Sequence, residues 1–187
     1  MDLPSAPPED ARVKAVVREF TEGRGQKEFR GSPIIVVKCL NFGELWDDIK
    51  NDVDQGHHGS HWRNVERMLL KADGKLAEEV CIELSRKLWA LWAALWEQSQ
   101  CGQLRVIIAA WCKSGRDRSP GMITFLANAL ARVGWGGAPP LHICGGPRGW
   151  RPHTAPTPCA QCITTACRDE VEEFFRRHPQ AVLPAMR

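Results

Sequence analysis

The residues with the clearest chemical potential lie between Trp111 and Ser119, where Cys112 is followed six residues later by Arg118 and then by a serine. An apolar run over residues 105–110 precedes this segment and predicts a buried strand, and a helix is expected from Pro120 to Val133. A strand, a short loop and a helix N-terminus favour anion binding, because backbone N–H groups converge there and the helix dipole attracts negative charge. We therefore expect a phosphate-binding loop made of Cys112, Lys113, Ser114, Gly115, Arg116, Arg118 and Ser119.

Each residue type in this loop suits a particular task. Gly115 permits the positive φ that a tight turn requires, and the guanidinium of Arg118 can donate to two phosphate oxygens at once. Ser119 is a suitable N-cap, and Pro120 suits the first helical position because that position needs no N–H donor.

Cys112 supports more than one interpretation. Three cationic neighbours and a helix N-terminus would stabilise its thiolate and lower its pKa, so Cys112 could attack phosphorus as a nucleophile. Alternatively, the loop only binds phosphate, and Cys112 is a small buried residue at the end of a strand. A strand–turn–helix unit that binds no ligand is the third possibility.

Composition limits the class of protein. The chain has 187 residues, 43% of them hydrophobic, which is enough for one domain with its own core. A formal net charge of +3 permits a basic patch without demanding nucleic acid. We expect no membrane association and no signal peptide, and hence an intracellular, cytoplasmic protein whose eight cysteines are thiols or metal ligands.

Strand and helix patterns alternate along the chain and predict an α/β fold. We expect a disordered lead over residues 1–10, an α/β domain over residues 11–140, and a Cys/His-rich loop with a terminal helix over residues 141–187, packed on the same domain. The predicted strands are residues 11–20, 33–40, 105–110 and 141–144, and the predicted helices are residues 44–49, 61–70, 75–98, 120–133 and 169–177. The expected architecture is a single, mostly parallel sheet flanked by helices.

The longest predicted helix, residues 75–98, carries two apolar stripes. One stripe consists of leucines and a valine at helical spacing, and the other consists of Trp89, Trp92 and Trp96. In the simpler interpretation both stripes are covered by neighbouring elements. The alternative is that the tryptophans form a surface for a protein partner, since large exposed aromatic patches mark interfaces.

Six potential metal ligands lie between residues 142 and 167. Cys159 and Cys162 have the spacing of a zinc-binding pair, and we expect His142 and Cys167 to complete the site, with Cys144 and His153 as alternatives. Zinc would supply folding energy to a stretch that is poor in apolar residues. The other interpretation is a loop whose thiols bind no metal.

Three segments resemble the C-terminal domain of the RapZ family of RNase adapter proteins. Residues 112–119 resemble that family's Cys-Thr-Gly-Gly-x-His-Arg-Ser motif, residues 20–25 resemble its Phe-Gly-x-x-x-Gly motif, and residues 36–41 are similar to its second strand, Asp-Val-Arg-x-Leu-x-Asn. The likeness covers roughly residues 12–133. Asp117 stands where the family has histidine, and Val37 and Lys38 stand where it has aspartate and arginine.

The resemblance implies an α/β domain that binds RNA and an amino-sugar phosphate. No Gly-x4-Gly-Lys-Ser/Thr motif occurs, so no nucleotide cofactor is expected. The sequence thus favours a phosphate-binding module, with a sugar phosphate or an RNA backbone as ligand, that acts as an adapter or sensor.

The Cys-x5-Arg-Ser string also resembles the signature of cysteine-dependent protein phosphatases. That resemblance implies Cys112 as the nucleophile and Arg118 as the phosphate clamp. Such an enzyme needs a general acid, for which Asp54 and Asp73 are the upstream candidates. A protein-interaction scaffold is the remaining alternative.

Overall fold

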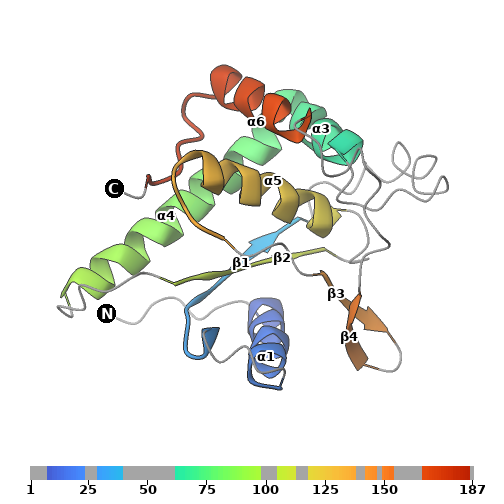
Figure 1. Ribbon diagram of the computed structural model, residues 1–187, viewed down its shortest axis with the longest axis vertical. Helices are drawn as coiled ribbons and strands as arrows, with labels where there is room; N and C mark the ends of the chain where they lie inside the picture. The colour runs from blue at the N-terminus through green and yellow to red at the C-terminus, as the bar shows by residue number, and fades with distance from the viewer. Residues whose placement is uncertain are drawn as a thin grey trace.

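The computed structural model describes eight stretches of the chain, and all structural statements below concern them: residues 8–23, 29–39, 62–97, 105–112, 118–137, 142–146, 149–153 and 166–185. Their secondary structure comprises α1 (Pro8–Gly23), β1 (Ile34–Lys38), α3 (Trp62–Leu70), a 3-10 turn (Lys71–Gly74), α4 (Lys75–Glu97), β2 (Ile107–Trp111), α5 (Arg118–Arg132), β3 (His142–Gly146), β4 (Gly149–His153) and α6 (Ala166–Arg177). Figure 1 shows their arrangement.

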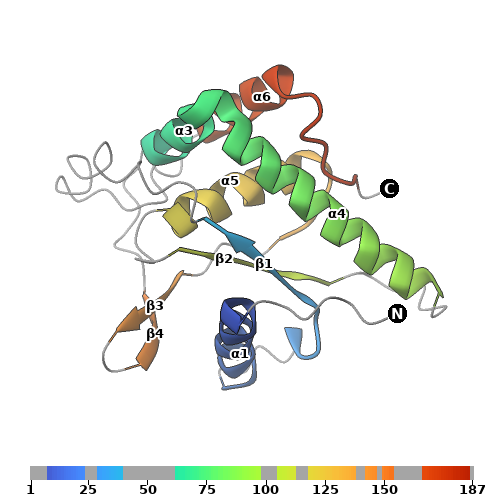
Figure 2. The ribbon, with the colours of Figure 1, turned by 180° about the vertical axis from the view of Figure 1, so that it is seen from behind.

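A parallel pair of strands, β1 and β2, lies between helices on both sides. Ile34 pairs with Ile107 and Lys38 with Trp111, so the two strands run in register over five residues. Helices α4 and α5 cover one face of the pair, with α3 and α6 packed beyond α5 on the same side, and α1 covers the other face (Figures 1 and 2). This layering explains why the first four residues of β1 are apolar, because its central residues are buried on both faces.

Alternation along the strands assigns their side chains to the two faces. Ile35, Val37 and Cys39 belong to the main core with α4 and α5, whereas Val36 is buried on the side of α1. Val36 also turns its carbonyl oxygen away from β2, and Lys87 of α4 donates a hydrogen bond to it at 3.0 Å. The same ammonium contacts Glu83 one turn earlier on α4, at 2.7 Å.

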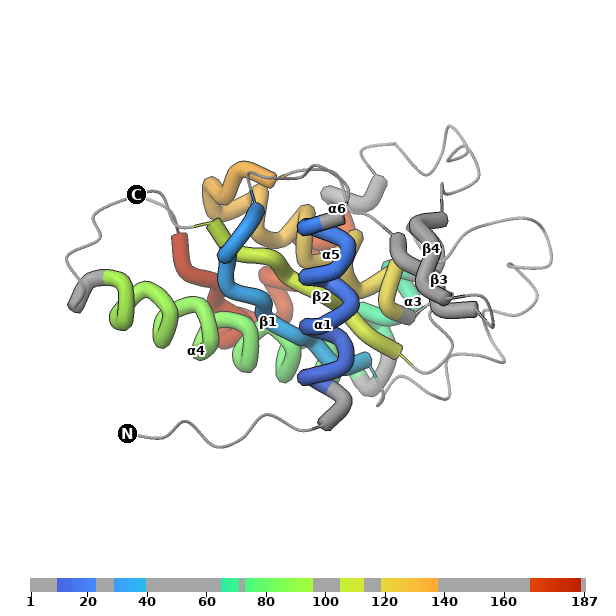
Figure 3. The backbone as a smooth tube through the Cα atoms, turned by 90° about the horizontal axis from the view of Figure 1, so that it is seen from below, coloured from blue at the N-terminus to red at the C-terminus, as the bar shows by residue number. Residues whose placement is uncertain are grey.

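The predicted strand over residues 11–20 is wrong, because these residues lie in helix α1. Val13 and Val17 are four residues apart, so they fit a helical period as well as an alternating one. The expected disordered lead also extends too far, since α1 begins at Pro8 and residues 1–7 lie outside the described part. Seen from below, α1 lies across the two strands (Figure 3).

Helix α4 confirms the long predicted helix and buries one of its two stripes. Val80, Leu84 and Leu88 lie in the core, each at most 8% exposed. Trp89 and Trp92, in contrast, are 57% and 42% exposed, so the expectation that neighbouring elements cover them is wrong. The side chain of Trp96 is outside the described part.

Helices α5 and α6 complete the core. Phe125 of α5 and Phe174 of α6 pack edge to face with ring centroids 5.2 Å apart, and Val171 is also buried. Helix α5 ends at Arg132, one residue before the predicted end, and a glycine with positive φ follows: Gly134 has φ 89°, and the N–H of Trp135 bonds back to the carbonyl of Leu130.

The predicted short strand at residues 141–144 corresponds to β3. It pairs antiparallel with β4 in a separate hairpin and not with the parallel pair. The predicted helix over residues 44–49 lies outside the described part. The described residues therefore form a mixed α/β structure in which two of the strands are parallel.

Candidate functional site

The two ends of the predicted phosphate loop lie against each other. Cys112 follows β2 directly, and Ser119 lies in the first turn of α5. The Sγ atom of Cys112 is 3.3 Å from the Oγ atom of Ser119, and both residues are buried, at 3% and 7% exposure. Either atom can be the donor, so the hydroxyl can stabilise a thiolate or accept a hydrogen bond from a thiol.

Helix α5 begins two residues earlier than the capping pattern predicts. Arg118 is already helical, so Ser119 lies inside the first turn and does not occupy the position before it. The hydroxyl of Ser119 contacts the sulfur of Cys112, seven residues earlier in the chain. The first backbone N–H groups of a helix have no acceptor within it, so this turn offers donors to an anion, although Pro120 contributes none.

Several predicted ligand residues lie outside the described part, namely Lys113, Ser114, Gly115 and Arg116. Arg118 opens α5, but its side chain is not described. Of the predicted ligand residues, the structure thus brings Cys112 and Ser119 together. The positions of the cationic side chains Lys113, Arg116 and Arg118 lie outside the described part.

The zinc prediction falls largely on residues outside the described part. Cys159 and Cys162 lie there, whereas the backbones of His142 and Cys167 lie in β3 and α6. Within the stretches that the structure describes, no three His, Cys, Asp or Glu side chains are grouped to hold a metal ion.

A second thiol, Cys39, lies beside Cys112. The N–H of Cys39 donates to the carbonyl of Trp111 at 2.9 Å, which continues the parallel ladder by one step and places Cys39 next to Cys112. Both residues belong to the core cluster on the α5 side of the sheet, and Cys39 is fully buried. The sequence analysis did not include Cys39, although its position directly after an apolar strand was a usable signal.

On the opposite face, the carboxyl end of β1 carries a charged pair. Lys38 of β1 contacts Asp10 of α1 at 3.5 Å, and its register partner is Trp111. Asp10 is largely buried, with a side-chain exposure of 15%, so this pair fixes α1 against the end of the sheet. Neither Asp10 nor α1 was anticipated from the sequence.

A hydrogen-bonded pair joins the C-terminal end of α6 to the start of α4. His178 Nδ1 lies 2.9 Å from Glu78 Oε2, with both side chains mostly buried, and the imidazole stacks on Phe174. Burial, and then the Glu78 carboxylate, raise the pKa of the nearby Cys81 thiol to about 12. Cys81 is therefore a thiol that resists ionisation, in a location separate from the loop.

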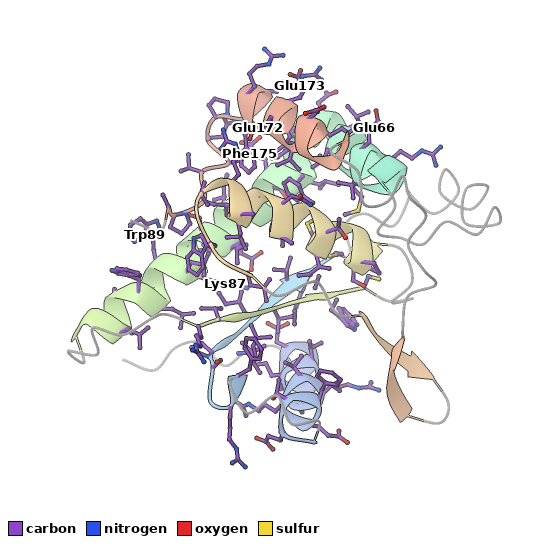
Figure 4. The ribbon with its side chains drawn as sticks, in the orientation of Figure 1. Glu66, Lys87, Trp89, Glu172, Glu173 and Phe175 are labelled. Atoms are coloured by element: carbon purple, nitrogen blue, oxygen red, sulfur yellow. The ribbon has the colours of Figure 1, made fainter. Side chains whose placement is uncertain are left out.

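The exposed side of α6 is highly charged, but its charges are mutually satisfied. Hydrogen bonds from Arg176 and Arg177 lower the pKa of Glu173 to about 2. Arg132 Nε donates to both carboxylate oxygens of Glu172, and its guanidinium lies over the Phe175 ring. Figure 4 labels Glu172, Glu173 and Phe175 on α6 and Glu66 on the neighbouring α3.

Among the helices that the structure describes, none combines the length and the apolar character needed to cross a bilayer.

Comparison of the chain with protein-family models, with curated proteins and with solved structures finds no match.

Proposed function

We propose that residues 112–119 form a phosphate-binding loop and that the chain acts as an α/β binding module, an adapter or sensor with a sugar phosphate or an RNA backbone as ligand. The contact between Cys112 and Ser119 carries the proposal, because it brings the end of β2 to the start of α5. A loop with both ends anchored in this way lies where α/β proteins bind ligands, at the carboxyl ends of parallel strands. The loop's cations, Lys113, Arg116 and Arg118, match an anionic ligand.

This proposal includes a finer statement about the fold. The parallel pair β1–β2 would belong to a mostly parallel sheet in a single domain that extends over residues 11–140, with residues 141–187 packed on it. Burial of Val171 and Phe174 of α6 in the same core as β1 supports this arrangement.

Thermal unfolding with increasing phosphate tests the binding function. Inorganic phosphate should raise the melting temperature of the wild-type protein and of Cys112→Ser, but not of Arg118→Ala. Arg86→Ala is the matched control, because Arg86 is an exposed arginine on α4. The proposal fails if phosphate, a hexosamine phosphate and an RNA oligonucleotide all leave the melting temperature unchanged.

The three probes also separate the ligand classes. An RNA ligand predicts an affinity that falls steeply with salt, because each neutralised backbone phosphate releases condensed counterions. A sugar phosphate predicts saturable stabilisation that inorganic phosphate competes with. Arg116→Ala should weaken either ligand.

A cysteine-dependent phosphatase is the alternative, with Cys112 as nucleophile and Arg118 as clamp. The hydroxyl of Ser119 supports it, because it lies 3.3 Å from the sulfur and is placed to hydrogen-bond a nucleophile at Cys112. Hydrolysis of an aryl phosphate that disappears in Cys112→Ser would establish this function. Of the two candidate acids, Asp73 lies exposed in the turn before α4, and Asp54 is outside the described part.

A protein-interaction role has a separate observation in its favour, the exposure of Trp89 and Trp92 on α4. Figure 4 labels Trp89, which lies outside the core. Binding of a protein partner that is lost in Trp89→Ala, while phosphate stabilisation persists, would establish this role independently of the loop.

Zinc binding by His142, Cys159, Cys162 and Cys167 remains a proposal that rests on spacing alone. Metal analysis of the purified protein, with cysteine alkylation before and after chelation, tests it. Protein without zinc, in which all three cysteines react at once, would contradict it.

A further inference from the structure

The carboxyl ends of β1 and β2 bring two thiols together on one face of the sheet. Ile35 pairs with Ile108 and Val37 with Ala110, and one more step in this register pairs Cys39 with Cys112. All six side chains belong to the α5 side, either in the core cluster or packed against it. The hydrogen bond from the Cys39 N–H to the Trp111 carbonyl shows that the ladder reaches these residues.

This placement meets the main geometric requirement for a disulfide. Neighbouring strands lie about 4.8 Å apart, and disulfides join Cα atoms separated by about 4.4–6.8 Å. Side chains in register on parallel strands project side by side, so their Cβ atoms are separated by about the strand spacing, against about 3.8 Å in a relaxed bridge. The bond would therefore be strained, and strained disulfides are readily reduced.

The surroundings give the two sulfurs different roles. Cys112 has the hydroxyl of Ser119 at 3.3 Å and therefore lies against the first turn of α5, next to the proposed loop. Cys39 lies after β1, at a corresponding step of the ladder, and supplies a second thiol. Cys81 is equally buried but has a pKa raised to about 12, so it does not share this environment.

We propose that Cys39 and Cys112 form a reversible oxidation site for hydrogen peroxide. The Cys112 thiolate attacks one peroxide oxygen, so an S–O bond forms, the O–O bond breaks, and the departing hydroxide takes up a proton to become water. The Cys39 sulfur then attacks the sulfenic sulfur of Cys112, the S–S bond forms, and the hydroxyl group leaves as water with the Cys39 proton. Two thiols are oxidised by two electrons in total, and one peroxide is reduced to two waters.

Burial selects the oxidant. With Cys39 fully buried and Cys112 3% exposed, the site needs a reagent that enters through small local opening. Hydrogen peroxide is little larger than water, whereas alkylating reagents are bulkier. The site should thus respond to peroxide while it resists alkylation in the folded protein.

Peptide mapping of the wild-type chain tests the proposal directly. Trypsin releases Cys39 in peptide 39–50, Cys112 in peptide 106–113 and Cys81 in peptide 76–86, each with a single cysteine. After peroxide treatment and blocking of the remaining thiols, we expect peptides 39–50 and 106–113 to be joined, with the loss of two hydrogen atoms. Dithiothreitol should restore both thiols.

Three results would overturn the proposal: Cys112 oxidised to sulfinic acid while Cys39 stays a thiol, Cys112 joined to another cysteine, or Cys112 unmodified at peroxide levels that oxidise the other cysteines. In Cys39→Ser, Cys112 should accumulate sulfenic and sulfinic acid. Cys81→Ser is the matched control and should leave the bridge unchanged. The wild-type map decides the question even if a variant does not fold.

The bridge itself does not depend on phosphate binding, but its consequence does. A bond between Cys39 and Cys112 would draw the sulfur of Cys112 away from Ser119, so oxidised protein should lose phosphate stabilisation and regain it on reduction. A bridge in a protein whose reduced form responds to none of phosphate, a hexosamine phosphate and RNA would refute the proposed function and leave the oxidation site standing.

Discussion

At the scale of single residues, Gly74 is a position where the addition of one methyl group should be costly. Gly74 has φ 80°, and a Cβ atom there would lie 2.2 Å from Nε2 of His178. The imidazole cannot easily move, because Glu78 bonds it on one side and Phe174 stacks against it. Gly74 is therefore required both by its backbone conformation and by its close neighbour.

We expect Gly74→Ala to lower the free energy of unfolding by about 2–4 kcal/mol, from the left-handed backbone and the clash together. Gly31→Ala is the matched control: Gly31 has φ 78° but nothing within 4 Å of an added Cβ, so it should cost only about 1–2 kcal/mol. Urea denaturation measures both. Equal losses would show that His178 moves aside freely.

Glu170 provides a prediction about pH. Burial, and then the charge of Glu66, raise its pKa above the usual 4.5, and its Oε2 atom has no hydrogen-bond partner within the described residues. The folded protein therefore binds this proton more tightly than the unfolded chain does. The contribution of Glu170 to stability is greatest when the pH lies below 4.5 and falls as the pH rises through the raised value.

Glu170→Gln imitates the protonated carboxyl group and should raise the melting temperature at neutral pH, by up to about 3 °C because the group is partly solvated. The gain should disappear near about pH 3, where wild-type Glu170 is itself protonated. Glu172→Gln on the same helix is the control, since it weakens the pair with Arg132 and should bring no gain. A gain that persists in acid would contradict the assignment.

At the scale of elements, helix α4 carries a buried side chain and an exposed one at consecutive positions. Leu88 is 1% exposed and Trp89 is 57% exposed. Leu88→Ala should cost about 2–5 kcal/mol of stability, because it leaves a cavity in the core. Trp89→Ala should cost less than half as much, although it removes the larger side chain.

Chemical denaturation of Leu88→Ala and Trp89→Ala measures which of the two side chains contributes more to the free energy of unfolding. If Trp89→Ala is the more damaging change, then Trp89 contributes to the core and not to a partner surface. If the expected order holds, loss of partner binding in Trp89→Ala can be attributed to the surface itself.

The sequence predicts most elements well but misses α1, for an identifiable reason. Val13, Ala15 and Val17 alternate, which is typical of a strand and predicts one over residues 11–20. The residues at the two ends of the segment indicate a helix instead. Pro8 starts the helix, Glu9 and Asp10 lie in its first turn, and Gly23 ends it, as helix boundaries require.

At the scale of the whole molecule, the C-terminal tail beyond α6 is part of the core. Ala181 and Leu183 are 0% and 3% exposed, whereas Val182 between them is 63% exposed. The indole N–H of Trp135, after α5, donates to the carbonyl of Pro184 at 2.6 Å. The tail thus connects the ends of α5 and α6.

Leu183→Ala should destabilise the protein by about 2–5 kcal/mol, and Val182→Ala by no more than about 0.5 kcal/mol. Thermal unfolding of the two variants, side by side, measures the difference. Two equally mild variants would show that the tail is detached in solution.

The relation between distant residues is what sequence reasoning could not supply. Cys112 and Ser119 belong to one predicted segment, and in the structure the Sγ atom of Cys112 lies 3.3 Å from the Oγ atom of Ser119. Sequence reasoning could not place Cys39 beside Cys112, because strand register depends on packing of the whole sheet and is not encoded within either strand alone. For the same reason, it could not decide that Leu88 is covered while Trp89 is exposed.

The bond from Lys87 to the Val36 carbonyl has a consequence for how copies of the protein meet. Among the described strands none pairs with the edge of β1 that carries the Val36 carbonyl, and an edge of this kind can template aggregation with other chains. The ammonium of Lys87 occupies this acceptor and places a positive charge there. A second molecule must displace that charge before it can add a strand to β1. Lys87 of α4 should therefore disfavour edge-to-edge association of two copies.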